Sequence, residues 1–293
     1  MPAKTAQSVS SPPGFGGAPL VGWHFLTEAA RTGDLVFFGC DIEINRRYGI
    51  ANPGAANFVR TGTALTGMFL PDSYDLGIMT LTDPRNAVGE IAATAARIIV
   101  GFGGLPVLIA CDHTASLGAI LGSSLGSGTA PIYVYFDAHF DLGRNCAPGD
   151  LLHNGGFVGE ILRQGWASQA VNIGGRSKET CIEYPDTPKN FYSIPGNGEA
   201  AAIIARLAPL AGQKVHVSID ADVLDPNVAP NVSCPEADGM TAQALLDCCR
   251  WIGRSCRVVG ADLSEVLPST ASRQSEQFLI RCLHALKRDY PRC

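Results

Sequence analysis

Acidic side chains, in two cases together with histidine, follow a short apolar run at four places in this sequence. The four segments are Cys111-Asp112-His113, Asp137-Ala138-His139-Phe140-Asp141, Asp220-Ala221-Asp222 and Asp262-Leu263-Ser264-Glu265. If the chain stays extended through the second segment, its two carboxylates and its histidine point to one side, and the third segment repeats the spacing. Carboxylates crowded in this way repel one another unless a cation lies between them. The pattern therefore predicts a metal site.

Charge balance and ligand type indicate how many metal ions to expect, and of which kind. The predicted ligands are the carboxylates of Asp137, Asp141, Asp220 and Asp222 and the neutral imidazoles of His113 and His139. Four carboxylates balance two divalent cations. Because oxygen ligands predominate and no thiolate is needed, Mn²⁺ is favoured over zinc, while cobalt or nickel could substitute in vitro. Two such ions lower the pKa of a shared water and make it a nucleophile, so we expect hydrolysis.

Taken singly, the same residues have ordinary structural explanations. A lone Asp-x-Asp is usually a turn or a helix cap. Glu265 alone would be interpreted as an exposed or capping carboxylate, and His153 as a loop histidine. The three other histidines are interpreted as structural: His24, His216 and His284. The metal prediction therefore depends on several clusters that all follow buried strands.

The elements that must position these residues alternate between strand and helix. Strands are expected at residues 34–39, 106–110, 132–136, 170–173, 214–219 and 257–261, and helices at 88–101, 114–121, 154–164, 198–207 and 241–252. The strands are apolar throughout, as in parallel sheets that helices cover on both faces. We expect an α/β fold, a single three-layer domain with a parallel sheet flanked by helices. Ligands bind beyond the carboxyl ends of such strands, so the clusters can converge on one crevice.

Composition narrows the domain organisation and the partners. The chain has 293 residues, of which 46% are hydrophobic, and we assign residues 1–18 to a flexible tail and 19–293 to one catalytic domain. A net charge of −5 gives no electrostatic reason to expect nucleic acid or a membrane surface as partner. The ten cysteines contain no CxxC pair and are expected to be reduced thiols. No apolar stretch is long enough to cross a membrane, and we expect a cytoplasmic protein.

The motifs resemble those of the ureohydrolase (arginase, agmatinase and formimidoylglutamase) family over about residues 35–283. The family's Asp-Ala-His-x-Asp is matched by residues 137–141 and its Ser-x-Asp-x-Asp-x-x-Asp-Pro by residues 218–226. Its Gly-Gly-Asp-His looks like Ala110-Cys111-Asp112-His113, and its Asp-x-x-Glu-x-x-Pro like residues 262–268. The resemblance implies an arginase-like fold and a manganese-dependent enzyme, which family members often assemble into trimers or hexamers.

The resemblance also implies a role for each site residue. Asp137 and Asp220 would bridge two Mn²⁺ ions; His113 and Asp141 would complete one site, and His139 and Asp222 the other. Glu265 would hold the planar cationic head of the substrate by a charge-assisted hydrogen bond. His153 stands at the position of the family's proton-shuttling histidine, with an ordinary pKa near neutrality.

Departures from the family pattern bear on the substrate. The interval from Asp141 to His153 is 12 residues, which resembles the agmatinase and guanidino-acid branch, since arginases have one more. The segment 144–149 lacks the Thr/Ser-rich run with which arginases hold an α-amino acid. We therefore expect a small cationic guanidino substrate, agmatine or a guanidino acid, cleaved to urea and an amine. Three further departures are Ala110-Cys111, Asn154 and Ser233-Cys234.

Three alternatives stay open. A formimidoylglutamate hydrolase would release formamide instead of urea, and residues 232–233 are reminiscent of that branch. Arginase itself is the second. The third is an inactive homologue that acts as a regulatory subunit, although an inactive chain has no chemical need for six intact metal ligands. As an active enzyme, the chain is expected to form a homo-oligomer.

Overall fold

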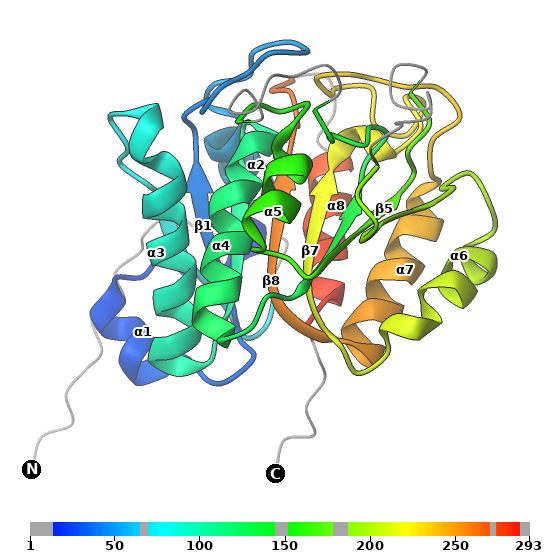
Figure 1. Cartoon of the computed structure of the whole chain (residues 1–293). Helices are drawn as coiled ribbons and strands as arrows, with labels where there is room; N and C mark the ends of the chain where they lie inside the picture. Colours follow the sequence, from blue (N-terminus) through cyan, green and yellow to red (C-terminus); the bar gives the residue numbers. More distant parts are fainter. Residues whose placement is uncertain (1–13, 65–69, 144–151, 178–186, 270–273, 288–293) are drawn as a thin grey trace, which may run out of the picture.

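One parallel sheet forms the centre of the molecule (Figure 1). The computed structural model describes residues 14–64, 70–143, 152–177, 187–269 and 274–287. Within them the strands are β1 (Leu35–Cys40), β2 (Ser73–Ile78), β3 (Leu105–Ala110), β4 (Ile132–Phe136), β5 (Gln169–Ile173), β6 (Phe191–Ile194), β7 (Lys214–Asp220) and β8 (Arg257–Ser264). Their order is β2-β1-β3-β8-β7-β4-β5-β6, and every neighbouring pair is parallel. The expected α/β class is confirmed.

The two edge strands were not predicted from the sequence. Strand β2 carries Asp75 and Gly77, and β6 exposes Tyr192, so neither is a continuous apolar run. Such runs mark strands that are covered on both faces, which an edge strand is not. The six inner strands lie where the sequence predicts them, and two are longer than expected: β7 continues to Asp220 and β8 to Ser264.

Helices cover both faces of the sheet, giving the three expected layers (Figure 1). One face packs against α1 (Trp23–Ala29), α3 (Pro84–Phe102), α4 (Ser116–Ser127) and α5 (Phe157–Gln164). The other packs against α2 (Ala55–Ala64), α6 (Ala200–Leu207), α7 (Ala242–Ser255) and α8 (Gln274–Ala285). Successive side chains of β1 alternate between the two cores: Leu35 and Phe37 face α2 and α8, whereas Val36 and Phe38 face α3 and α4.

The packed part of the chain begins earlier than residue 19. Residues 14–18 were expected to belong to the tail, yet Phe15 is fully buried with its ring centroid 5.8 Å from that of Phe37. Residues 1–13 of the expected tail lie outside the described residues. Among those described, no helix is both long enough and apolar enough to span a bilayer.

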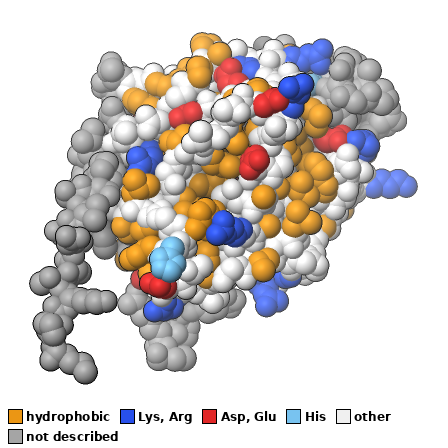
Figure 2. All heavy atoms as spheres, turned by 90° about the vertical axis from the view of Figure 1, so that its left-hand side faces the viewer, with side chains coloured by type: hydrophobic (Ala, Val, Ile, Leu, Met, Phe, Trp, Pro, Cys, Tyr) orange, Lys and Arg blue, Asp and Glu red, His pale blue; other side chains and the backbone are white. Residues whose placement is uncertain are grey.

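The outer surface of the helical layer near α1 and α3 is partly apolar. Figure 2 shows this face, on which apolar side chains gather near the middle with single charged side chains among them. Phe25 of α1 and Val100 of α3 are among the exposed hydrophobic residues. This face thus exposes more apolar side chains than is usual for a helix surface that contacts only water.

Candidate active site

The four acidic and histidine clusters lie at the carboxyl ends of four adjacent strands. In the sheet order, β3, β8, β7 and β4 are consecutive neighbours. Each of them ends in one cluster or is directly followed by it. Because parallel strands end at the same edge, their loops meet there. The sheet therefore brings the six predicted ligands together, although the sequence alone does not reveal the strand order.

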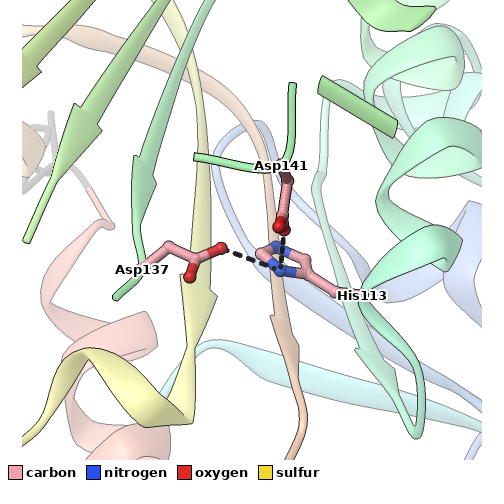
Figure 3. Close-up of side chains that lie close together, drawn as sticks. All are labelled: His113, Asp137 and Asp141. Atoms are coloured by element: carbon pink, nitrogen blue, oxygen red, sulfur yellow. Dashed lines mark ion pairs between the residues drawn. The ribbon is translucent and has the colours of Figure 1, made fainter. Parts of the chain in front are cut away.

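His113 lies among three of the predicted carboxylates. It opens the 3-10 turn η2 (His113–Ala115) after β3, and its Nδ1 atom is 3.1 Å from Asp137 Oδ2, 3.0 Å from Asp220 Oδ2 and 3.6 Å from Asp141 Oδ2. Figure 3 shows the carboxylates of Asp137 and Asp141 directed at the imidazole of His113 from two different sides. His113, Asp137 and Asp141 thus form one group whose ligand atoms lie close enough to share a metal ion.

His139 forms a second group beside the first. Its Nδ1 atom is 3.0 Å from Asp222 Oδ2 and 3.3 Å from Asp137 Oδ1, so Asp137 belongs to both groups. On its other side, His139 Nε2 is 3.7 Å from the partly exposed carboxylate of Glu236, which was not predicted. Two adjacent groups that share one carboxylate are the arrangement a pair of bridged cations requires.

The local backbone differs from the expected extended strand. Strand β4 ends at Phe136, and Asp141 has a φ of 50°, in the left-handed region. The side chains of Asp137, His139 and Asp141 therefore converge through a turn rather than through strand alternation. Glu265 also has a left-handed backbone, with a φ of 63°. Strain of this kind in non-glycine residues occurs preferentially at functional sites.

Backbone amides hold one oxygen of each of three carboxylates and leave the other directed at a histidine. Asp137 Oδ1 accepts from the His139 amide at 2.6 Å, Asp220 Oδ1 from the Asp222 amide at 2.9 Å, and Asp222 Oδ1 from the Ala138 amide at 3.0 Å. The Oδ2 atoms of Asp137 and Asp220 are the ones nearest to His113, and that of Asp222 is nearest to His139, whereas Asp137 faces His139 with its Oδ1 atom. The ligand atoms are thus oriented before any cation arrives.

Two buried atoms at the centre lack hydrogen bonds and fit a metal site. His113 Nδ1 and Asp137 Oδ2 lie 3.1 Å apart, yet neither makes a hydrogen bond to any described residue. Buried polar atoms are seldom left in this state because the cost is about 1–3 kcal/mol each. A cation bound here would supply the missing partner, and carboxylate and imidazole donors are of the type that suits Mn²⁺.

The pKa values of Asp141, Asp220 and His113 reflect the crowding of ionisable groups in this cluster. Burial, with the neighbouring Asp137 carboxylate, raises the pKa of Asp141, and burial with Asp222 and Asp137 does the same for Asp220. Burial opposes the charged form of His113, but its interactions with Asp137 and Asp220 outweigh burial and its pKa is raised. Burial and crowding thus shift the pKa values of these three groups upward, and a cation bound here would compete with protons.

A column of buried polar groups supports His113 from behind. Ser218 Oγ lies 3.0 Å from His113 Nε2 and donates to Asp262 Oδ1 at 2.5 Å, and Ser116 donates to the same oxygen at 2.7 Å. His216 Nε2 is 2.7 Å from Asp262 Oδ2, and Ser123 lies 2.8 Å from His216 Nδ1. His216, interpreted as structural from the sequence, therefore belongs to the support of a predicted ligand.

Glu265 lies next to the cluster, already paired with an arginine. Its Oε1 atom accepts from the His113 amide at 3.0 Å, and its Oε2 atom from Arg46 Nη1 at 2.9 Å. Burial raises the pKa of Glu265 to about 7, with Arg46 opposing the shift and Asp112 adding to it. Glu265 is where the sequence predicts a substrate-binding carboxylate, but part of its hydrogen-bonding capacity is taken up within the protein.

His153 is buried beneath the segment that carries Arg46. The Gly155 amide donates to its Nδ1 atom at 3.1 Å, and Arg47 Nη1 lies 3.3 Å from its Nε2 atom. Asn154 accepts at Oδ1 from the amides of Arg47 and Tyr48 and donates to the Tyr48 carbonyl. The role of His153 as a proton carrier stays a prediction, whereas Asn154 gains a clear structural task.

Sequence reasoning missed several residues that shape the site. Arg46 carried no spacing signal, since its contact with Glu265 joins residues 219 positions apart. Arg176 donates to the carbonyls of Asp222, Glu236 and Ala237 and so ties the two loops beside His139 together. Asp262 stood inside a quoted motif without a role. Its place at the end of a buried strand was the available signal.

Comparisons with known proteins agree with this arrangement. The family model described as Arginase family matches residues 55–285. A formimidoylglutamase of Rhodococcus jostii is 26% identical over 256 residues, 80% of this chain and 78% of its own, and an agmatinase of Bacillus cereus is 34% identical over 138 residues, 46% of each chain. The structure of Trypanosoma cruzi formiminoglutamase with Mn²⁺ superimposes with a TM-score of 0.75 at 19% identity, covering 89% of this chain and 93% of that one.

Because the family match covers most of the sequence, the chain belongs to the arginase family and is a hydrolase of that family. The likeness to solved structures establishes the same fold. The resemblance inferred from the motifs is thereby confirmed at the level of family, fold and hydrolase chemistry.

Proposed function

We propose that this chain is a two-manganese hydrolase that cleaves a C–N bond in linear amidines. The observation that carries the proposal is the pair of buried, unsatisfied ligand atoms His113 Nδ1 and Asp137 Oδ2 between two groups of carboxylates and histidines. Two Mn²⁺ ions at these groups would activate water and polarise the substrate. The relatives named formimidoylglutamase and agmatinase, and the Mn²⁺ of the Trypanosoma cruzi formiminoglutamase structure, support this assignment.

The chain's own side chains have separable tasks in this reaction. The six predicted ligands hold the ions: five form the two groups that share Asp137, and Asp220 lies beside the first group, with its Oδ2 atom 3.0 Å from His113 Nδ1. Glu265 orients the head group of the substrate from beside His113. His153 carries a proton to the departing amine, for which an imidazole is suited near neutral pH. All these groups are buried or nearly so, which strengthens their electrostatic effect on the substrate.

The sequence favours a guanidino head group, and a formimidoyl head group is the second candidate. Water added to R–NH–C(=NH)–NH₂ gives R–NH₂ and urea, whereas water added to R–NH–CH=NH gives R–NH₂ and formamide. The pairing of Glu265 with Arg46 favours the second candidate, because it occupies one acceptor oxygen that a guanidinium needs.

Metal analysis and product analysis test the proposal together. Protein loaded with MnCl₂ and then desalted should carry about two Mn²⁺ per chain, in keeping with two ligand groups. It should release urea or formamide from amidine substrates, and Mn²⁺ removal should abolish turnover. Loaded protein that hydrolyses neither class would contradict the proposal and favour the inactive regulatory homologue instead.

Assembly and location are further parts of the proposal. We propose a homo-oligomer, trimer or hexamer, from the resemblance to the family, and the exposed apolar side chains of α1 and α3 are compatible with a covered face. Light scattering after size exclusion tests it. The proposed partner is a small amidine substrate in the cytoplasm, with neither nucleic acid nor membrane required.

A further inference from the structure

The guanidinium of Arg46 is built into the site as a fixed group. Its side chain is 7% exposed, and its donors reach Glu265 Oε2 and Ser233 Oγ, both at 2.9 Å, and Asn52 Oδ1 at 2.7 Å. It also donates to the Cys111 carbonyl at 2.9 Å and to Glu43 Oε1 at 2.8 Å. All three guanidinium nitrogens of this arginine donate hydrogen bonds. Movement of the side chain out of the site would leave several buried acceptors unpaired, so this conformation is strongly favoured.

The backbone next to Arg46 also holds this side chain in place. Gly49 has a φ of 77°, and a Cβ atom there would clash with Ser233 Oγ and lie 2.7 Å from Cys234 Sγ, so the loop that carries Ser233 packs directly on it. Ser233 also accepts from the Ile50 amide and donates to the Ile50 carbonyl. The position of Arg46 is therefore fixed by two loops and not by its ion pair alone.

The pairing limits what Glu265 can offer a substrate. Its two oxygens already accept from Arg46 and from the His113 amide, so two of its about four lone-pair sites are used within the protein. A bidentate contact between a carboxylate and a guanidinium needs both oxygens on one edge.

The two candidate head groups differ in the number of N–H donors that they offer to Glu265. A monosubstituted guanidinium has five N–H donors, whereas a formamidinium has three, because a C–H replaces one NH₂ group. A C–H needs no acceptor. In this site the extra NH₂ of the guanidino group would compete with Arg46 for Glu265, and unmet hydrogen bonds discriminate strongly between substrates.

We propose that Arg46 is the residue that sets head-group specificity, by occupying Glu265 so that the site accepts a formimidoyl group in preference to a guanidino group. The inference rests on the proposed amidine hydrolysis and names its substrate class. Arg46 does not act on the reacting atoms in this proposal; it is a specificity determinant that works through Glu265.

Matched pairs of substrates test the proposal on the Mn²⁺-loaded wild-type protein. N-formimidoyl and N-amidino derivatives are compared on the same three amines, glutamate, γ-aminobutyrate and putrescine, and formamide and urea are measured separately. We expect kcat/KM to be at least about tenfold higher for the formimidoyl member of the pair built on the best amine. A preference for the amidino member would overturn the role of Arg46 while amidine hydrolysis stands. Turnover of neither class would overturn the proposed function itself.

Replacement of the arginine then tests the cause of the preference. Arg46→Met keeps the length of the stem but removes the fork and frees Glu265 Oε2, so the ratio of amidino to formimidoyl turnover should rise about tenfold. Arg46→Lys keeps the charge and should give a smaller rise. Arg85→Met, at an exposed arginine on α3 paired with Asp83, is the matched control and should leave the ratio unchanged.

Metal content and thermal unfolding are measured for each variant, so that the ratio is compared only among folded, loaded proteins. An unchanged ratio in folded, loaded Arg46→Met would contradict the proposal, as would equal loss of both activities. If Arg46→Met does not fold, the Arg46→Lys variant and the wild-type preference still decide the question.

Discussion

Ser218 Oγ lies 3.0 Å from His113 Nε2 and fixes which nitrogen of that imidazole faces the carboxylates. The hydroxyl hydrogen of Ser218 is donated to Asp262, so its oxygen must accept from His113 Nε2–H. The Nδ1 atom is then left with its lone pair directed at Asp137 and Asp220, ready for a cation. Support of this kind behind a metal ligand is worth roughly tenfold to a hundredfold in affinity.

Ser218→Ala should therefore weaken Mn²⁺ binding by about tenfold, without loss of fold. Titration calorimetry measures the affinity, and ¹⁵N chemical shifts of the histidine side chains show whether the Nδ1-acceptor tautomer of His113 is lost. Ser123→Ala, at the far end of the same column beside His216, is the control and should bind Mn²⁺ as the wild type does. Equal affinity in both variants would mean that Ser218 does not set the tautomer.

Asp262→Asn tests the column through stability and pH. Burial alone would raise the pKa of Asp262, but the hydrogen bond and charge of His216, with Ser218, outweigh it and the pKa lies below its usual range. An acid with a lowered folded-state pKa contributes stability above its unfolded pKa, about 4, and loses that contribution as the pH falls through the folded value.

The variant should accordingly be about 3 kcal/mol less stable than the wild type at pH 7, since it removes one partner of a buried pair. The difference should shrink below about pH 4, where the wild-type carboxylate loses its advantage. Urea unfolding of both proteins, without metal, at pH 7 and at stepwise lower pH measures it. A difference that stays constant across this range would show that the charge of Asp262 is not what matters.

Asp137→Asn and Asp141→Asn separate the two groups of ligands. Asp137 belongs to both groups and Asp141 only to the one with His113. Loss of Asp137 should therefore empty both sites and abolish turnover, whereas loss of Asp141 should leave about one ion per chain at the His139 group. Elemental analysis after desalting gives the stoichiometry. Retention of two ions by Asp137→Asn would sink the assignment of a shared carboxylate.

The residues of the buried acidic and histidine cluster could be selected from the sequence because each leaves a local trace there. Asp137 and His139 follow a buried apolar strand and Asp220 is the last residue of another, and in a parallel sheet all such strand ends share one edge. The strand order β3-β8-β7-β4, which makes those ends neighbours, depends on long-range pairing that no local pattern encodes. Edge strand β6 was missed for a related reason, because one side of it has no partner to demand an apolar run.

The partners of Glu265 could not be predicted, because nothing local connects them. Arg46 comes from the loop after β1 and Ser233 from the loop between β7 and α7, and they meet only once the sheet has formed. The sequence marks Ser233-Cys234 and Asn154 as unusual for the family without saying why. In the structure, Ser233 and Asn154 hold residues 46–50 in place.

Asn154 ties the loop of His153 to the loop of Arg46. Its side chain makes three hydrogen bonds to the backbone of Arg47 and Tyr48, with distances of 2.9 to 3.2 Å. Asn154→Ala removes all three and should let both loops shift, so kcat/KM should fall about tenfold, as small misplacements at an active site do. Because Asn154 touches no predicted ligand, Mn²⁺ content should stay at the wild-type value, and stability should fall by only about 1–2 kcal/mol.

Asn45→Ala is the control: it removes the hydrogen bond from Asn45 to the Leu152 carbonyl between the same two loops, and it should have the smaller effect. Steady-state kinetics with metal analysis of both variants decide the matter. If Asn154→Ala loses its metal, the two loops support the metal centre itself and not only the substrate side of the site.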